Sequence, residues 1–308
     1  MKRILVAAAL ATSLATTAAN AEDAKCQKVR FADVGWTDIQ VTTGVTQVIL
    51  EALGYEPEVK TLSVPVTFAS MRNKDIDVFL GNWMPSMTAD IKEYLDDKSV
   101  EQIGVNLPDA GYGLVVPQYV LDAGVKSLTD LGAHKDKFES KIYGIEAGND
   151  GNRIISEMIA KPENNLTGFE LVESSEAGML TQAEKAIKNN EWIVFLGWTP
   201  HPTMGEMKIA YLDGMGDSGF GAAQVLTVTR AGYTTECPNV GKLLTNLKFN
   251  LKMEGEMMAP VLKDGADPKA TALAWLKANP DAATPWLAGV NTIDGSDSVA
   301  ALKAALAK

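Results

Sequence analysis

The chain has 308 residues, of which 46% are hydrophobic, and its 28 basic and 39 acidic residues give a formal net charge of −11. This acidic balance excludes the basic surface expected of a nucleic-acid-binding protein, and it mildly favours a cationic ligand. The length suffices for two lobes of ordinary domain size, each with its own hydrophobic core.

The first 21 residues have the features of a secretory signal peptide. Lys2 and Arg3 precede the apolar run 4–14, and the sequence Ala-Asn-Ala at 19–21 supplies a small-residue cleavage site. The apolar run is shorter than the roughly 20 residues that span a bilayer. We therefore expect a mature chain that starts at Glu22, carries a net charge of −13 and is periplasmic.

Two cysteines, Cys26 and Cys237, remain in the mature chain. Because export leads to an oxidising compartment, we expect them to form a disulfide, although two free thiols are the alternative. The bridge would close a loop of about 210 residues. It would also place the start of the mature chain beside the segment around residue 237.

The first part of the mature chain alternates strands and helices. In chain order we predict a strand at 29–34, a helix capped by Thr37 or Asp38 and ending near 53, a strand at 58–62, a helix at 64–73, a strand at 76–80 and a helix at 88–95. This alternation is typical of an α/β fold with a mostly parallel sheet and helices on both faces.

The pattern changes around residues 101–120, where an apolar strand at 111–117 follows no such helix. We interpret this as a crossover into a second lobe. The elements predicted after it are a helix at 128–132, a strand at 141–145, a helix through 154–159, a strand at 169–173, a helix at 177–188 and a strand at 192–196. Residues 208–212 start the return to the first lobe, and a strand at 224–229 and helices at 240–251, 254–261 and 269–278 follow.

These elements predict two α/β lobes joined by two crossings. Lobe I would be discontinuous and comprise residues 22–104 and 208–308, and lobe II would comprise residues 105–207. Such a topology suits hinge closure over a ligand in the cleft between the lobes.

Four aromatic residues stand at glycine-flanked ends of predicted strands: Trp36, Trp83, Tyr112 and Trp198. Open α/β sheets bind ligands at such strand ends. A quaternary ammonium group has no N–H to donate, but aromatic faces attract its charge while its methyl groups pack on the rings. Each ring alone could equally be an ordinary core aromatic. Four in equivalent positions predict one aromatic box around a small cation.

Three segments carry a more specific signal: residues 34–38 (VGWTD), 79–85 (FLGNWMP) and 195–201 (FLGWTPH). With these motifs the chain resembles the periplasmic substrate-binding proteins of ABC transporters, in the group that binds glycine betaine, choline and proline betaine. It is most similar to the choline-binding members. The resemblance covers essentially the whole mature chain and implies a type II periplasmic binding protein fold.

The resemblance also implies roles for individual residues. Trp36, Trp83, Tyr112 and Trp198 would surround the trimethylammonium group, while Asp38 and Asn149 would bind the hydroxyl end of choline. A Cys26–Cys237 bridge agrees with the same resemblance.

Asp38 favours choline over betaine on physical grounds. Betaine carries a carboxylate that Asp38 would repel, whereas choline offers a hydroxyl donor and a net positive charge. Two alternatives stay open. Asp38 could cap the following helix, alone or in addition to binding, and His201 could bind a betaine carboxylate or lie in a loop at the rim of the cleft.

Enzymatic functions find little support in the sequence. Two histidines, His134 and His201, are too few for a multi-histidine metal site, and no Gly-x-Ser-x-Gly elbow occurs. Residues 148–151 (GNDG) lack the lysine and the spacing of a P-loop. They suit a helix-capping turn, whether or not Asn149 also binds a polar ligand.

We therefore predict a monomeric periplasmic protein without cofactor or metal. It would capture choline, with acetylcholine and weaker betaines as further ligands, and deliver it to the permease of an ABC importer in the inner membrane. A glycine betaine or proline betaine-binding protein of the same fold is the alternative, and a secreted choline-ester hydrolase is a remote one.

Overall fold

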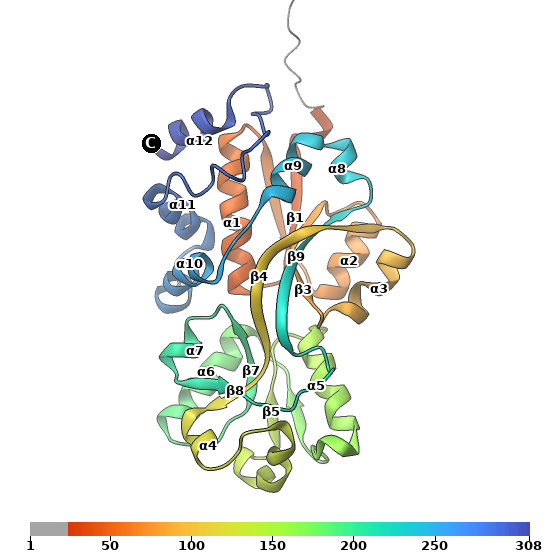
Figure 1. Cartoon of the computed structure of the whole chain (residues 1–308), viewed down its shortest axis with the longest axis vertical. Helices are drawn as coiled ribbons and strands as arrows, with labels where there is room; N and C mark the ends of the chain where they lie inside the picture. Colours follow the sequence, from red (N-terminus) through yellow and green to blue (C-terminus); the bar gives the residue numbers. More distant parts are fainter. Residues whose placement is uncertain (1–23) are drawn as a thin grey trace, which may run out of the picture.

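Two long strands hold the molecule together along its long axis (Figure 1). In the computed structural model, which describes residues 24–308, strand β4 (Val100–Pro117) pairs antiparallel with strand β9 (Gly221–Arg230). One end of this ribbon lies in an upper half of the molecule and the other in a lower half. The predicted signal peptide, residues 1–21, lies outside the described residues.

The upper half contains the predicted βαβαβα unit. Its elements are η1 (Ala24–Cys26), β1 (Lys28–Asp33), α1 (Thr37–Ala52), β2 (Glu56–Thr61), α2 (Val64–Arg72), β3 (Val78–Met84) and α3 (Thr88–Asp96). Helix α1 buries the face that carries Val41, Val45, Val48 and Ile49, as the helical spacing of these residues predicts.

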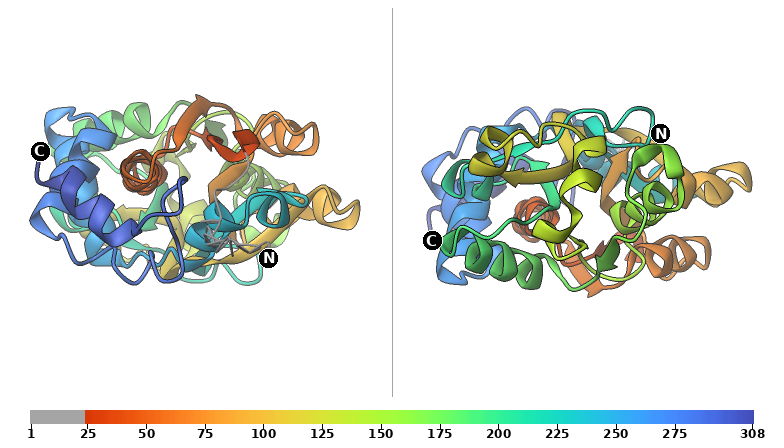
Figure 2. Two further views of the ribbon diagram at one scale, coloured as in Figure 1. Left: turned by 90° about the horizontal axis from the view of Figure 1, so that it is seen from above. Right: turned by 90° about the horizontal axis from the view of Figure 1, so that it is seen from below.

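The C-terminal helices complete the same half. They are α8 (Tyr233–Glu236), α9 (Pro238–Asn246), α10 (Leu251–Asp264), α11 (Pro268–Ala278) and α12 (Ser298–Leu306). Helices α10 to α12 lie on one flank beside α1, and α2 and α3 lie on the opposite flank (Figure 1, Figure 2). The predicted helix over 240–251 ends at Asn246, because the Asn250 side chain accepts hydrogen bonds from the next N–H groups and starts α10.

The lower half is a smaller α/β unit. Its elements are α4 (Gln118–Asp122), η2 (Leu128–Phe138), β5 (Lys141–Tyr143), α5 (Asp150–Ala160), η3 (Pro162–Asn164), β6 (Glu170–Val172), α6 (Glu176–Lys188), β7 (Phe195–Thr199), α7 (Thr203–Glu206) and β8 (Ile209–Tyr211). Helices α5 and α6 lie on either side of its strands (Figure 1).

All strands of the described residues join one curled sheet in the order β2-β1-β3-β9-β4-β7-β5-β6, with β8 also paired to β4. The pairs β1–β2, β1–β3, β5–β6 and β5–β7 are parallel, but every pair that involves β4 or β9 is antiparallel. The sheet is therefore mixed rather than mostly parallel. The reason is that β4 leaves the upper half and β9 returns to it in the opposite direction.

The predicted α/β fold with two halves and two crossings is confirmed. The boundaries at 104/105 and 207/208 stay a prediction. The pairing of β8 with residues 115–117 of β4 favours a return crossing within β9 instead of near residue 207. Among the described residues, no helix combines the length and the apolar composition that crossing a membrane requires.

The predicted disulfide is confirmed. Cys26 is bonded to Cys237, and both residues are buried in the core of the upper half. The bridge ties η1, just before β1, to the start of α9. The N-terminal segment thus lies beside residue 237, as expected from the sequence.

Candidate functional site

A small buried cavity lies where the two halves meet. About 240 Å³ around its wall atoms is not filled by protein, a figure that includes open solvent, and the enclosed part has room for little more than one water molecule. Its walls are formed by Trp36, Asp38, Trp83, Tyr112, Ile145, Asp150 and Trp198. The cavity therefore suits a ligand of only a few heavy atoms.

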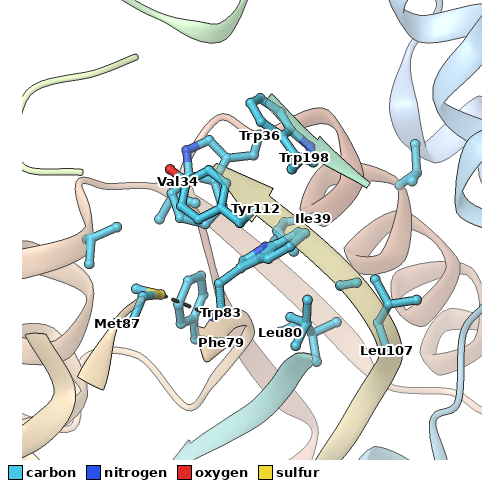
Figure 3. Close-up of a cluster of buried hydrophobic side chains, with 14 of the residues drawn as sticks. Val34, Trp36, Ile39, Phe79, Leu80, Trp83, Met87, Leu107, Tyr112 and Trp198 are labelled. Atoms are coloured by element: carbon cyan, nitrogen blue, oxygen red, sulfur yellow. Dashed lines mark hydrogen bonds between the residues drawn. The ribbon is translucent and has the colours of Figure 1, made fainter. Parts of the chain in front are cut away.

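The structure brings the four predicted rings together (Figure 3). Each is between 4% and 6% exposed. Tyr112 of β4 is paired with Trp198 of β7, and the ring centroids of Trp83 and Tyr112 are 5.8 Å apart. Trp36 comes from the β1–α1 junction, where Gly35 supplies the positive φ of +88° that the turn requires. The rings thus converge from both halves.

Polar contacts fix two of the rings. The Trp36 indole N–H donates to Glu146 Oε1 at 2.9 Å, and the Tyr112 hydroxyl donates to Asn149 Oδ1 at 3.2 Å. Tyr112 also depends on Gly151, where any Cβ atom would lie 2.1 Å from the tyrosine hydroxyl oxygen. The contacts of Tyr112 lie within one half and orient its ring in the open state as well, whereas the Trp36 contact joins the two halves and fixes the Trp36 ring in the closed form.

Two carboxyl groups face the same cavity. Asp38 and Asp150 are each 1% exposed; both oxygens of Asp38 and the Oδ2 atom of Asp150 have no hydrogen-bond partner. Burial raises the pKa of Asp38 to about 8, with a further contribution from the nearby Glu176 carboxylate. Burial likewise raises the pKa of Asp150 to about 7.

Burying carboxylates without partners is costly. Among residues 24–308, no lysine or arginine lines the cavity to offset their charge. The aromatic walls, the unpartnered Asp38 carboxyl group and the free Oδ2 atom of Asp150 therefore suit a small cation, which would compensate both carboxyl groups.

The structure also decides between the alternatives for Asp38. The residue lies in the first turn of α1, but the N-cap position is occupied by Trp36, and the Asp38 oxygens accept no hydrogen bond from the helix. The interpretation of Asp38 or Thr37 as an N-cap is therefore wrong. The carboxyl group of Asp38 is directed at the cavity instead.

Asn149 has the capping role that the GNDG turn predicted. Its Oδ1 atom accepts from the backbone N–H groups of Gly151 and Asn152, at 2.8 and 3.2 Å, and from Tyr112. Asn149 does not line the cavity, whereas the adjacent Asp150 does. The acidic side chain next to Asn149 was the only sequence signal for Asp150, and no motif pointed to Ile145.

His201 lies behind the cavity and not in it. Its ring packs edge to face on Trp198, with centroids 4.8 Å apart, and its Nε2 atom lies 3.1 Å from Glu176 Oε1. The sequence did not predict a role for Glu176. Within the described part of the chain, no group of three or more histidine, cysteine or acidic side chains is arranged to hold a metal ion.

Comparison with known proteins identifies the family to which this architecture belongs. The family model for the substrate binding domain of the ABC-type glycine betaine transport system matches residues 27–278. The chain belongs to this family.

Solved structures of the same kind are similar over nearly the whole chain. An ABC-transporter choline binding protein in complex with choline is 57% identical, with a TM-score of 0.90 over 92% of this chain and 100% of that chain. The unliganded semi-closed form of such a protein is 56% identical, with a TM-score of 0.83 over the same shares. The predicted periplasmic binding protein fold is thereby confirmed.

A more distant relative in this substrate-binding family has a different ligand in its name. The glycine betaine/carnitine transport binding protein GbuC of Listeria monocytogenes is 30% identical over 182 residues, which are 58% of this chain and 60% of GbuC. Family membership alone therefore does not select one quaternary ammonium compound.

Proposed function

We propose that this protein captures choline and delivers it to the permease of an ABC importer. The observation that carries the proposal is the cavity itself, where four aromatic rings meet the unpartnered Asp38 carboxyl group and the free Oδ2 atom of Asp150. The similarity to a choline complex over 92% of the chain supports it.

The rings would bind the trimethylammonium group. Each desolvated aromatic face contributes about 2 kcal/mol at best to binding a cation. Three or four faces would therefore give micromolar affinity or better, before the cost of ordering the ligand. Trp36, Trp83, Tyr112 and Trp198 surround the cavity closely enough for the methyl groups to pack on them.

The carboxyl groups would neutralise the charge and bind the hydroxyl group. An ionised Asp38 or Asp150 accepts the choline O–H, and the cation offsets the cost of their burial. Asn149 would act indirectly, through its hydrogen bonds to Tyr112 and to the start of α5.

Choline fits this charge distribution better than glycine betaine or proline betaine. The betaines carry a carboxylate that would lie beside Asp38 or Asp150, and within the described residues the cavity offers no lysine or arginine as a counter-charge. Acetylcholine keeps the quaternary ammonium group but lacks the hydroxyl donor, so we expect it to bind more weakly than choline.

Isothermal titration with choline, acetylcholine, glycine betaine and proline betaine tests this proposal. We expect 1:1 binding with choline as the tightest ligand. Glycine betaine binding more tightly than choline would show that the cavity is a betaine site, and the absence of binding by all four would refute a quaternary ammonium site.

We further propose that the protein acts in the periplasm as a monomeric binding protein and not as an enzyme. Its relatives are transport proteins, and each half contributes walls to the cavity, so that one chain forms a complete site. Incubation with acetylcholine or phosphocholine should return each compound unchanged. Release of free choline would instead support the alternative function of a choline-ester hydrolase.

A further inference from the structure

Helix α1 has no cap of its own. The first N–H groups of a helix need acceptors, but the side chain of the N-cap residue, Trp36, makes no capping hydrogen bond. The acceptor comes from the other half of the molecule. Glu176, in the first turn of α6, accepts from the Thr37 backbone N–H at 2.8 Å and from the Thr37 hydroxyl at 2.7 Å. The carboxylate also faces the positive end of the α1 dipole.

His201 holds the Glu176 carboxylate in position. The Nδ1 atom of His201 lies 3.3 Å from the backbone nitrogen of Thr203, whose N–H can only donate. Nδ1 is therefore the acceptor, and the ring proton of the neutral imidazole resides on Nε2, which donates to Glu176 Oε1 at 3.1 Å. The Thr203 hydroxyl lies 2.6 Å from the same Nδ1 atom. One tautomer thus satisfies the whole chain of contacts.

This chain of hydrogen bonds lies directly behind the aromatic box. Thr37 stands between Trp36 and Asp38, both of which line the cavity. On the other side, His201 packs against Trp198. Cavity walls from both halves are therefore coupled to the Glu176 contact by adjacent residues or by direct packing.

We propose that Glu176, positioned by His201, is a latch that caps helix α1 only when the two halves close, and that it sets how long the ligand stays bound. Thr37 belongs to the upper half and Glu176 to the lower half, so opening the cleft must break both hydrogen bonds. Both residues are buried in this structure, at 6% and 4% exposed. The inference rests on the proposed function, because it takes choline as the ligand that is retained.

The charge of the latch couples it to the ligand. Burial raises the pKa of Asp33, Asp38 and Glu146, and the nearby Glu176 carboxylate adds to each increase. Among the described residues, no lysine or arginine forms an ion pair with Glu176, and His201 is its partner instead. A cation in the cavity relieves this repulsion, so that the latch closes more favourably over a bound cation than over an empty site.

The test measures how fast choline binds and leaves, by stopped-flow tryptophan fluorescence. For Glu176→Ala we expect an unchanged association rate and a dissociation rate at least tenfold higher, because the latch forms after the ligand enters. For His201→Ala we expect a smaller increase, of about threefold, because the carboxylate remains but is no longer oriented. Glu184→Ala is the matched control, since Glu184 is exposed and lies about two turns further along α6.

A double-mutant cycle distinguishes a latch from a general loss of packing. Thr37→Val removes the hydroxyl donor at nearly constant volume. It should raise the dissociation rate in the wild-type background and have almost no effect in Glu176→Ala, because the partner is already absent. Independent, additive effects would overturn the proposal, as would a wild-type dissociation rate in Glu176→Ala. Equal melting temperatures of the unliganded variants would verify that folding is intact.

The latch and the proposed function can fail separately. If wild-type protein does not bind choline, the proposed function fails, and the same rates are measured with whichever of the four quaternary ammonium compounds binds. If choline binds but Glu176→Ala retains it as long as the wild type does, only the latch is wrong.

Discussion

Asp77 and Asp38 both belong to the upper half and are almost equally buried, at 2% and 1% exposed, but only Asp77 has partners. Arg30 donates to both Asp77 oxygens, at 2.7 and 2.8 Å, and Arg230 donates to one of them at 2.8 Å. Asp38 accepts no hydrogen bond of normal geometry, although the Trp83 indole and adjacent backbone N–H groups lie close enough to lower its pKa slightly. The two residues therefore show a satisfied and an unsatisfied way of burying a carboxyl group.

The pKa values follow this difference. Burial alone would raise both, but hydrogen bonds from Arg30 and Arg230 lower the pKa of Asp77, whereas burial and Glu176 raise that of Asp38 to about 8. A partnered buried carboxylate stabilises the fold. An unpartnered one beside an aromatic cavity destabilises the protein until a ligand compensates its charge. The upper half therefore has two regions, a structural region around Asp77 and the ligand site around Asp38.

The largest expected effect concerns the structural region, where the disulfide lies next to Glu236, a partner of Arg230. Replacing Cys26 and Cys237 by serine should lower the free energy of unfolding by about 4 kcal/mol, because the bridge closes a long loop. Urea unfolding measures this change. Choline affinity at 25 °C should stay within a factor of two, and a large loss of affinity would contradict the separation of the two regions.

The next largest effect is expected at Asp77 itself. Asp77→Asn should lower the free energy of unfolding by about 3 kcal/mol, because it removes the carboxylate that Arg30 and Arg230 share and leaves the mostly buried Arg230 with Glu236 alone. Thermal or urea unfolding measures the loss, and titration should find the wild-type affinity for choline. If Asp77→Asn were as stable as the wild type, the ion-pair network would not contribute as we infer.

At the site, replacing aspartate by asparagine should weaken ligand binding and leave stability intact, the opposite of its effect at Asp77. Asp38→Asn removes a carboxylate that has no partner in the protein, so we expect the unliganded protein to be as stable as the wild type or slightly more stable. Choline affinity should fall about 100-fold, corresponding to the loss of one charged hydrogen bond of about 2–3 kcal/mol. Calorimetric titration measures the loss, and glycine betaine affinity should fall much less. Unchanged choline affinity would exclude Asp38 from the site.

The smallest expected effect is the pH dependence of binding. The folded-state pKa of Asp38 lies above its unfolded value of about 3.9. Ionisation of Asp38 therefore lowers the free energy of unfolding increasingly as pH rises from 4 to about 8. Asp77, with a lowered pKa, contributes stability above about pH 4 that is lost as pH falls. Glu176 of α6 and Glu254 of α10 are the other acidic groups that interact with Asp38.

Because a bound cation favours the ionised form of Asp38, choline affinity should increase with pH up to about 8 and then level off. The increase should not exceed about tenfold per pH unit for a single proton. Titrations at pH 6, 7 and 8 measure it, and Asp38→Asn should reduce the slope to the part contributed by Asp150. Equal affinities at pH 6 and 8 would show that Asp38 is already ionised in the unliganded protein.

Local elements were largely predictable, because they depend on spacing within short segments. The predicted strand at 29–34 is observed as Lys28–Asp33, and the predicted helix at 64–73 is observed as Val64–Arg72. The largest difference is the strand predicted at 111–117, since β4 already begins at Val100. Residues 100–110 carry no strong alternation, and they are extended because β9 pairs with them.

The amino-acid sequence by itself determined the alternation of strands and helices, the disulfide partners and the four rings of the box. Rings at glycine-flanked strand ends can be recognised locally, and two cysteines allow only one intramolecular pair. The antiparallel crossing of β4 and β9, the choice of Asp150 instead of Asn149 as a cavity wall, and the capping of α1 by Glu176 were decided only by the tertiary structure. Each depends on groups far apart in the chain, whose meeting is set by how the two halves close and not by any short-range pattern.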